Sequence, residues 1–417
     1  TPADTTGPYV WPLTARDTTA LRDQARRLHH HLTTHTTHPA DVAHALTTTR
    51  TTFDHRAAVI ADNHNDLLTA LTHLADNTPH PNTITGTATT NTGPVYLYSG
   101  QGSQRPTMGA QLYKTFPAYA QAIDNITDAF TPHLPHPLRD ILHAQPGTPH
   151  AELLHTTQYA QPAIFALGTA LTHLLTTRNI TPTAVLGHSI GAYAAAHTAG
   201  ILTLTDATTL VATRANLMQQ APTNGTMTAI QATPQEAQTA IEAIDGHQHL
   251  VSIAAINSAT SIVISGDTTT VNTITNHFHN QGRRTKQLTV SHAFHSPHMD
   301  TVLDQFLTTA SQITYHQPTI PFISDLTGQL ATHQELTNPH YWTNHIRNTV
   351  QYHQALTTTH TLTNTTTYLE LGATPTLTPP TRETLDNTTV LPLLRNNDNE
   401  PHHLTTTLTT TWTTGTT

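Results

Sequence analysis

The sequence predicts an α/β protein made of a large subdomain, a smaller subdomain inserted into it, and a separate N-terminal α/β domain. Three observations carry this prediction. Strand-like and helix-like patterns alternate from residue 95 onward, which favours a layered α/β architecture. Residues 226–290 follow the order strand, helix, strand, strand, helix, strand, which is the ferredoxin-like βαββαβ pattern. A Thr-, Pro- and Gly-rich stretch over 77–92 indicates a linker after the N-terminal part.

The N-terminal domain is expected over residues 1–92. An apolar run at 9–13 predicts its first strand, followed by helices over 18–33 and 40–52, a strand over 56–61 and a helix over 66–74. Residues 379–417 are expected to form a C-terminal linker segment that packs back on this domain. That segment should hold a strand at 390–394 and a Thr-rich helix that reaches residue 412.

The large subdomain is expected in two parts, 93–218 and 289–378, with the small subdomain inserted over 219–288. A buried-strand run at 95–98 opens the large subdomain and leads into the glycine-containing loop 99–102. The small subdomain is expected to contain strands over 226–231, 250–256, 261–265 and 286–290, with helices over 234–243 and 269–280.

The composition excludes several classes of protein. With 417 residues, 36% hydrophobic and 10% charged, the chain has the size and make-up of a globular protein of two or three units. A net charge of −9 with no basic stripe argues against nucleic-acid binding. The absence of cysteine excludes disulfides and a thiolate nucleophile. No signal peptide and no apolar run long enough for a membrane helix are seen, so a cytoplasmic location without membrane contact is expected.

The 33 histidines raise the question of a metal site. They have no cysteine companions and no closed ligand pattern of the HExxH type, so we expect no metal and attribute their number to compositional drift. The chain starts with Thr1 rather than Met, which suggests a piece of a longer polypeptide.

The strongest local motif is Gly-His-Ser-Ile-Gly over residues 187–191, which fits G-x-S-x-G between an apolar strand and an Ala-rich helix. That context is the one a nucleophile elbow requires, because the serine hydroxyl then stands exposed at a helix N-terminus. Ser189 is therefore the candidate nucleophile. A turn of small residues with an incidental serine is the competing interpretation.

At this point the sequence resembles the malonyl-CoA:acyl carrier protein transacylase family, and within it the acyltransferase domain of modular type I polyketide synthases. The resemblance rests on residues 187–191, on Tyr-Ala-Gln-Pro at 159–162, on Gly-Gln-Gly-Ser-Gln at 100–104 and on His-Ala-Phe-His-Ser-Pro-His at 292–298. The N-terminal region, with residues 12–16 and 53–56, resembles the linker that joins a ketosynthase to the acyltransferase. The resemblance to the transacylase family implies an α/β-hydrolase-like large subdomain with an inserted ferredoxin-like small subdomain.

The resemblance also assigns roles to residues. Three histidines, His292, His295 and His298, lie close together, and the residues alone do not choose among them. The motif implies His295 as the general base, oriented by the backbone carbonyl of Gln351 because no acid is paired with it. The backbone N–H groups of Gln101 and Ile190 would form the oxyanion hole.

Arg214 is implied to grip the free carboxylate of a malonyl group, a task suited to the planar, permanently charged guanidinium. Acyl-unit selectivity is expected from Phe294, His292, Ile190 and Tyr159. Phe294 stands where methylmalonyl-specific relatives carry serine, so a malonyl unit is expected. Two positions depart from the family pattern, since Ala192 replaces the usual Glu and Thr374 the usual His.

The expected reaction moves a malonyl unit from malonyl-CoA to Ser189 and then to the phosphopantetheine thiol of an acyl carrier protein. No bound cofactor is expected, since the coenzyme A thioester is a substrate and phosphopantetheine belongs to the carrier protein. A neighbouring ketosynthase domain in the same polypeptide is the other expected partner. The alternatives are a methylmalonyl-specific enzyme, a catalytically silent module, and a serine hydrolase whose acid could be Asp267.

Overall fold

The computed structural model describes residues 8–35, 37–89, 92–244, 246–396 and 399–415. The chain divides into two compact units. The smaller unit holds the described residues of 8–93 and 399–415, and the larger unit holds residues 94–396.

The smaller unit is built on an antiparallel sheet with the strand order β1-β2-β3. Its helices cover a core that includes the fully buried Trp11, Ala25 and Val59. The C-terminal helix α18 contacts β2 and β3, and the guanidinium of Arg56 donates a hydrogen bond to the carbonyl of Trp412 at 2.6 Å. The elements of this unit are β1 (Tyr9–Ala15), α1 (Thr18–Thr34), α2 (Pro39–Thr48), β2 (His55–Ala61), α3 (His64–Ala75), β3 (Thr83–Thr87) and α18 (Glu400–Thr413).

Two expectations for this part of the chain need correction. Residues 77–92 contain β3, which the linker interpretation missed, because a Thr-rich edge strand with one large apolar residue has no hydrophobic alternation. Residues 379–396 belong to the larger unit rather than to the segment that returns to the smaller one. The reason is that β12 (Thr389–Pro392) pairs in parallel with β11 (Thr367–Leu371).

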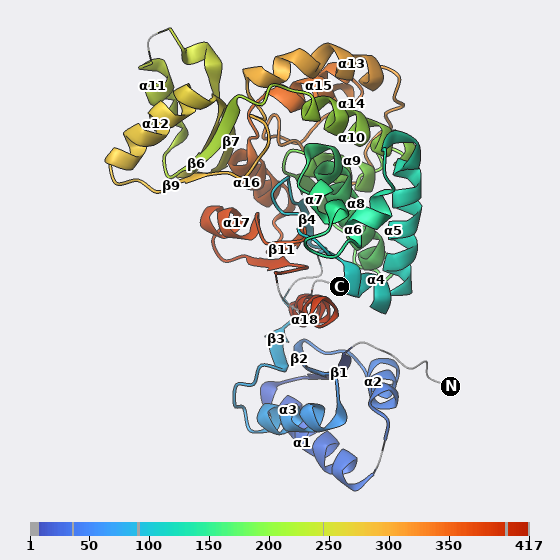
Figure 1. The fold of residues 1–417 in the computed structure, drawn as a ribbon. Coiled ribbons are helices and arrows are strands. Elements are labelled where there is room, and N and C mark those ends of the chain that lie inside the picture. The colour runs from blue at the N-terminus through green and yellow to red at the C-terminus, as the bar shows by residue number, and fades with distance from the viewer. Residues whose placement is uncertain (1–7, 36, 90–91, 245, 397–398, 416–417) are drawn as a thin grey trace. The chain divides into compact units, whose positions relative to one another are not determined.

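The large subdomain contains a parallel sheet with the order β10-β5-β4-β11-β12, flanked by helices (Figure 1). Helix α8 is almost entirely buried and packs against α5, α9 and α10. Besides β11 and β12, the elements are β4 (Val95–Tyr98), α4 (Ala110–Thr115), α5 (Pro117–Phe130), α6 (Leu138–Leu142), α7 (Pro149–Leu153), α8 (Thr157–Thr176), β5 (Ala184–Gly187), α9 (Gly191–Thr198), α10 (Leu204–Gln219), α13 (Leu303–Ala310), β10 (Phe322–Ile323), α14 (His333–Leu336), α15 (Pro339–Arg347), α16 (Tyr352–Thr363) and α17 (Thr378–Thr384).

The small subdomain is an antiparallel sheet of order β7-β8-β6-β9 with α11 and α12 packed on one face (Figure 1). A separate core that includes Ile230, Ile264 and Phe278 joins the helices to the sheet. The elements are β6 (Gly225–Ile230), α11 (Pro234–Glu242), β7 (Val251–Ser258), β8 (Ser261–Asp267), α12 (Thr268–Asn280) and β9 (Thr285–Gln287). This order confirms the ferredoxin-like pattern, although β9 is shorter than the expected 286–290.

No helix of the described residues is both long enough and apolar enough to cross a bilayer. The cytoplasmic location expected from the sequence stays a prediction.

Candidate active site

Ser189 lies in a tight turn between the parallel strand β5 and helix α9. Its φ of 52° is in the left-handed region, which is costly for a serine and is found at strained functional turns. Glycines flank it because side chains do not fit. A Cβ on Gly187 would lie 2.1 Å from the backbone nitrogen of Ala192, and a Cβ on Gly191 would lie 2.1 Å from the carbonyl oxygen of Tyr98. The strand–turn–helix geometry of a nucleophile elbow is therefore present.

His295 faces Ser189 directly. The distance between Ser189 Oγ and His295 Nε2 is 2.7 Å, and His295 is almost fully buried. His295 Nδ1 donates to the carbonyl oxygen of Asn348 at 2.9 Å. Because a carbonyl can only accept, the ring proton resides on Nδ1, and Nε2 carries the lone pair that faces the serine hydroxyl.

The carbonyl that orients His295 does not belong to the expected residue. The family resemblance implied Gln351 in this role, but the acceptor is Asn348, which follows the end of α15 in an extended conformation. Gln351 instead precedes α16, and its N–H donates to the carbonyl oxygen of Asp325 at 2.6 Å. A backbone carbonyl leaves no trace in residue identity, so the motif pointed to a position three residues away.

The pKa of His295 lies well below its usual value. Burial is the main cause, because it disfavours the charged imidazolium, and the neighbouring Arg214 guanidinium adds repulsion. The hydrogen bond to Asn348 acts weakly in the other direction. His295 is therefore neutral near pH 7, which is the protonation state that a general base needs.

Arg214 comes from helix α10 and is 1% exposed. One terminal nitrogen, Nη2, donates to Ser189 Oγ at 3.1 Å, and the guanidinium lies 5.7 Å from the ring centre of Tyr193. Its Nε is buried without a hydrogen-bond partner among the described residues. A buried charged donor beside the nucleophile is suited to an anionic ligand group.

Ser189, His295 and Arg214 line a cavity of about 90 Å³ between the large and small subdomains. Polar and apolar side chains both line it. The remaining lining residues are Gln101, Gln161, His188, Met218, Met227, Ala254, Ala255, Val263, Leu288, Val290 and Phe294.

The two residues expected to form the oxyanion hole belong to two segments that lie close to Ser189. Gln101 lines the cavity, and its side-chain oxygen accepts a bond from Gln161 at 3.4 Å. The loop that carries Gln101 abuts the elbow, because a Cβ on Gly100 would lie 2.8 Å from the carbonyl oxygen of His188. Ile190 immediately precedes α9. The oxyanion role of both backbone N–H groups stays a prediction.

Of the four residues expected to govern selectivity, Phe294 alone presents its side chain among those lining the cavity. His292 is buried, with its ring 6.0 Å from that of Phe294. The side chain of Ile190 is fully buried and does not line the cavity. Tyr159 lies on α8, where its hydroxyl accepts the N–H of His136 at 3.0 Å. A direct selectivity contact is therefore available to Phe294 and not to the other three.

Sequence reasoning missed a buried acid behind the elbow. Asp325 is fully buried, and its Oδ2 accepts the backbone N–H of Ser189 at 2.7 Å. Its Oδ1 lies 2.9 Å from Nε2 of the buried His345. Asp325 thus stabilises the strained turn through the amide of Ser189, and among the described residues no hydrogen bond joins it to His295. The one available signal was an acid just after a strand, but β10 has two residues and no detectable pattern.

Other expected features can also be located. Asp267 serves as the N-cap of α12, where its carboxylate accepts the N–H of Thr270 at 3.0 Å, so the acid suggested for a hydrolase is used elsewhere. Ala192 is buried in the first turn of α9, and the Thr374 hydroxyl donates to the carbonyl of Ser103 at 3.2 Å. No cluster of three or more metal-ligating side chains exists in the described part of the chain.

Comparison with protein families assigns most of the chain. Residues 95–417 match the family described as acyl transferase domain, and residues 9–71 match the family described as CurL-like, PKS C-terminal. The chain is 45% identical over 345 residues to the spectinabilin polyketide synthase system protein NorB of Streptomyces orinoci, covering 82% of this chain and 16% of that protein. It is 41% identical to polyketide synthase GfsA of Streptomyces halstedii, covering 84% of this chain and 5% of GfsA. The chain therefore spans a small part of these relatives.

Solved structures give the same assignment. The acyltransferase domain from module 8 of the salinomycin polyketide synthase has a TM-score of 0.89 at 29% identity, with 98% of this chain and 96% of that chain covered. The malonyl-CoA:acyl carrier protein transacylase of Xanthomonas oryzae has a TM-score of 0.67 at 25% identity, with 74% and 97% covered. These neighbours confirm the α/β fold with a large and a small subdomain.

Proposed function

The chain belongs to the acyl transferase domain family, in the form found in modular type I polyketide synthases, and from this premise we propose that it carries a malonyl unit on Ser189 from malonyl-CoA to an acyl carrier protein. One observation supports the proposal most strongly. Within one buried cavity, the nucleophile contacts both a neutral imidazole, at 2.7 Å, and a guanidinium, at 3.1 Å. The first contact suits covalent catalysis, and the second suits an acyl group that ends in a carboxylate.

In the first half-reaction, Ser189 Oγ attacks the thioester carbonyl carbon while His295 Nε2 takes its proton. The bond from Nδ1 to Asn348 keeps the ring in the required tautomer. The carbonyl oxygen becomes an oxyanion, which the backbone N–H groups of Gln101 and Ile190 would stabilise. The carbon–sulfur bond then breaks, and the proton on His295 passes to the departing thiolate of coenzyme A.

In the second half-reaction, the phosphopantetheine thiol of the carrier protein gives its proton to His295 and attacks the malonyl ester. The ester bond breaks, and Ser189 Oγ recovers the proton. Arg214 would hold the free carboxylate through both steps. No cofactor takes part, since coenzyme A and phosphopantetheine arrive with the two substrates.

We also propose that a ketosynthase domain neighbours this domain in the same polypeptide. Residues 9–71 match a C-terminal family of polyketide synthases, and the relatives that the chain matches are several times its length. The carrier protein is proposed as the acceptor on the same basis.

A two-stage transfer assay tests the proposed reaction. The protein is incubated with malonyl-CoA, freed of coenzyme A by desalting, and then mixed with a carrier protein bearing phosphopantetheine. We expect the malonyl group to move to the carrier protein. Release of free malonate at the same rate with and without the acceptor would instead identify a serine hydrolase. Absence of any enzyme-bound malonyl group in folded protein would identify a silent module.

The acylation rate should depend weakly on pH in the neutral range. Because burial and Arg214 lower the pKa of His295 well below its usual value of about 6.5, the imidazole should stay neutral as the pH falls through this value. We expect a flat rate from about pH 8 to about pH 6, with loss of activity only under more acidic conditions. Single-turnover acylation measured across this range checks the expectation. A rate that falls by half at pH 6.5 or above would contradict the low pKa.

Phe294 should exclude a methyl branch from the acyl pocket. Its ring lines a cavity of about 90 Å³, so a serine in its place would free space beside Ser189. We expect Phe294→Ser to raise the ratio of methylmalonyl to malonyl loading by about tenfold, since one methyl group is worth about 1–3 kcal/mol. Competition between the two thioesters, read by mass spectrometry, measures this ratio. As a control, Tyr159→Phe removes a hydroxyl outside the cavity and should leave the ratio unchanged. An unchanged ratio in Phe294→Ser would assign selectivity to other residues.

A further inference from the structure

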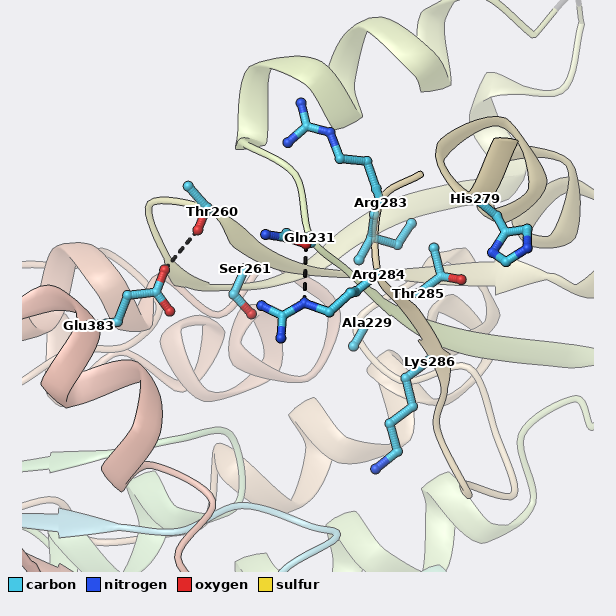
Figure 2. A pocket seen from close by; sticks show the side chains of 11 residues that line it. Ala229, Gln231, Thr260, Ser261, His279, Arg283, Arg284, Thr285, Lys286 and Glu383 are labelled. Atoms are coloured by element: carbon cyan, nitrogen blue, oxygen red, sulfur yellow. Dashed lines mark hydrogen bonds between the residues drawn. The ribbon is translucent and has the colours of Figure 1, made fainter. Parts of the chain in front are cut away.

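The small subdomain carries a second and larger cavity, with a volume of about 900 Å³. Figure 2 shows that basic side chains gather on one side of it, from the end of α12 and from β9 with its preceding loop. These are His279, Arg283, Arg284 and Lys286. The run 283–286 holds three of the 17 basic residues in a chain whose net charge is −9, so the positive charge here is locally concentrated.

Part of the lining of the large cavity lies on the same face of the sheet as the catalytic cavity. Side chains two residues apart in a strand share a face, and cross-strand partners lie about 5 Å apart. On β6, Met227 lines the catalytic cavity and Ala229 lines the large one. Ala229 pairs on one side with Lys286 of β9 and on the other with Val263 of β8, which lines the catalytic cavity. The two cavities therefore meet at the Ala229–Val263 pair.

Two of the cations are free to receive an anion. Arg283 is occupied, since its Nη2 forms an ion pair with Glu236 at 2.7 Å. Among the described residues, the Arg284 side chain bonds through Nε to the side-chain oxygen of Gln231 at 3.2 Å, and neither Arg284 nor Lys286 forms an ion pair. Both side chains are exposed and thus accessible from solvent.

An acid also borders the cavity, on the side opposite these cations. The Oε1 of Glu383 in α17 accepts hydrogen bonds from the hydroxyls of Ser258 and Thr260, each at 2.7 Å. Figure 2 shows the bond from Thr260. The hydroxyls partly satisfy this carboxylate and hold it against the β7–β8 hairpin. An anion would therefore bind at the Arg284 and Lys286 side of the cavity.

The distance along the β6 segment from the catalytic cavity to the basic run is within the reach of a pantetheine arm. Gln231, whose N–H bonds to the carbonyl of Arg284 at 2.9 Å, lies four residues beyond Met227, which corresponds to about 13 Å of strand. A pantetheine arm spans roughly 16 Å from its sulfur to its phosphorus when extended, at ordinary bond lengths. A thioester with its acyl group in the catalytic cavity would thus place its phosphate beside the basic run.

We propose that Arg284 and Lys286 bind the phosphate at the far end of the pantetheine arm. This phosphate is common to coenzyme A, where it begins the diphosphate, and to the carrier protein, where it is attached to serine. A single site would then align both the donor and the acceptor with Ser189. The proposal rests on the malonyl transfer proposed above.

The double variant Arg284→Gln/Lys286→Gln tests this site with three malonyl thioesters. Malonyl-CoA and malonyl-phosphopantetheine carry the phosphate, and malonyl-N-acetylcysteamine lacks it. We expect the KM for acylation of Ser189 to rise about fivefold to tenfold for the first two, as suits two exposed charge contacts, and to stay unchanged for the third. The variant Arg27→Gln/Lys114→Gln removes two exposed charges elsewhere and should leave all three KM values unchanged.

The transfer step provides a second test, because there the carrier protein is the source of the phosphate. With malonyl-Ser189 formed beforehand, the double variant should need about five- to tenfold more carrier protein for half-maximal transfer. Equal KM changes for all three thioesters would overturn the proposal. A rise for malonyl-CoA alone would also overturn it and would assign the site to the nucleotide part of coenzyme A. If the parent protein is acylated by none of the thioesters, the proposed function itself fails, and the phosphate site falls with it.

Discussion

Replacement of Ser189 by alanine is expected to reduce malonyl transfer to the carrier protein by about 10⁴-fold or more. Removal of a covalent nucleophile leaves only the catalysis that binding and oxyanion stabilisation can provide. The substitution deletes one oxygen, and the 2.7 Å contact with His295 is lost with it. Steady-state transfer of a radiolabelled malonyl group measures the effect.

A matched control tests whether a serine-to-alanine change away from the site also lowers the transfer rate. Ser311 is an exposed serine at the end of α13, and Ser311→Ala should transfer malonyl at the parent rate. If Ser189→Ala kept more than about a tenth of the parent rate while remaining folded, another group would have to be the nucleophile.

Replacement of Arg214 by methionine should reverse the preference between malonyl and acetyl thioesters. Arg214 is buried beside the nucleophile, and it has a donor, Nε, without a partner among the described residues. Removal of the cation leaves the malonyl carboxylate buried and unpaired, which is expected to lower malonyl acylation by about 10²–10³-fold. Acetyl acylation should stay at the parent rate or rise, because an acetyl group leaves the guanidinium unpaired in the parent protein.

Comparing the malonyl and acetyl thioesters also separates loss of the carboxylate contact from misfolding of the variant. A misfolded variant would lose both activities, whereas loss of the carboxylate contact lowers the malonyl rate alone. Arg214→Lys keeps the charge but lacks the planar fork, so we expect an intermediate loss of about tenfold. Equal losses for malonyl and acetyl in an Arg214→Met protein whose circular dichroism spectrum matches the parent would show that Arg214 acts on Ser189 rather than on the substrate.

Residue types predicted the turn that carries the candidate nucleophile. Ser189 was identifiable because a nucleophile elbow constrains the sequence on both sides, through two glycines whose Cβ atoms would collide with backbone. The ferredoxin-like subdomain was identifiable because its strands and helices follow clear hydrophobic periods. Such local steric and apolar constraints leave direct marks in the sequence.

Contacts between residues that are far apart in the sequence could not be predicted from local sequence patterns. The orienting carbonyl belongs to Asn348 rather than Gln351, and any residue type can supply a carbonyl. Asp325 reaches the amide of Ser189 only because β10 lies beside β5 in the sheet. Ile190 and Tyr159 lie near the motifs in sequence, yet their side chains point into the protein core. Sequence proximity to a motif does not reveal the direction of a side chain.

The mass of the intact protein after brief mixing with malonyl-CoA tests the central claim most directly, with Ser189→Ala treated in parallel. The account predicts that the parent gains the mass of one malonyl group, that this adduct disappears when carrier protein is added, and that Ser189→Ala gains nothing. An equal adduct on Ser189→Ala, or no adduct on folded parent protein that also releases no malonate, would contradict it.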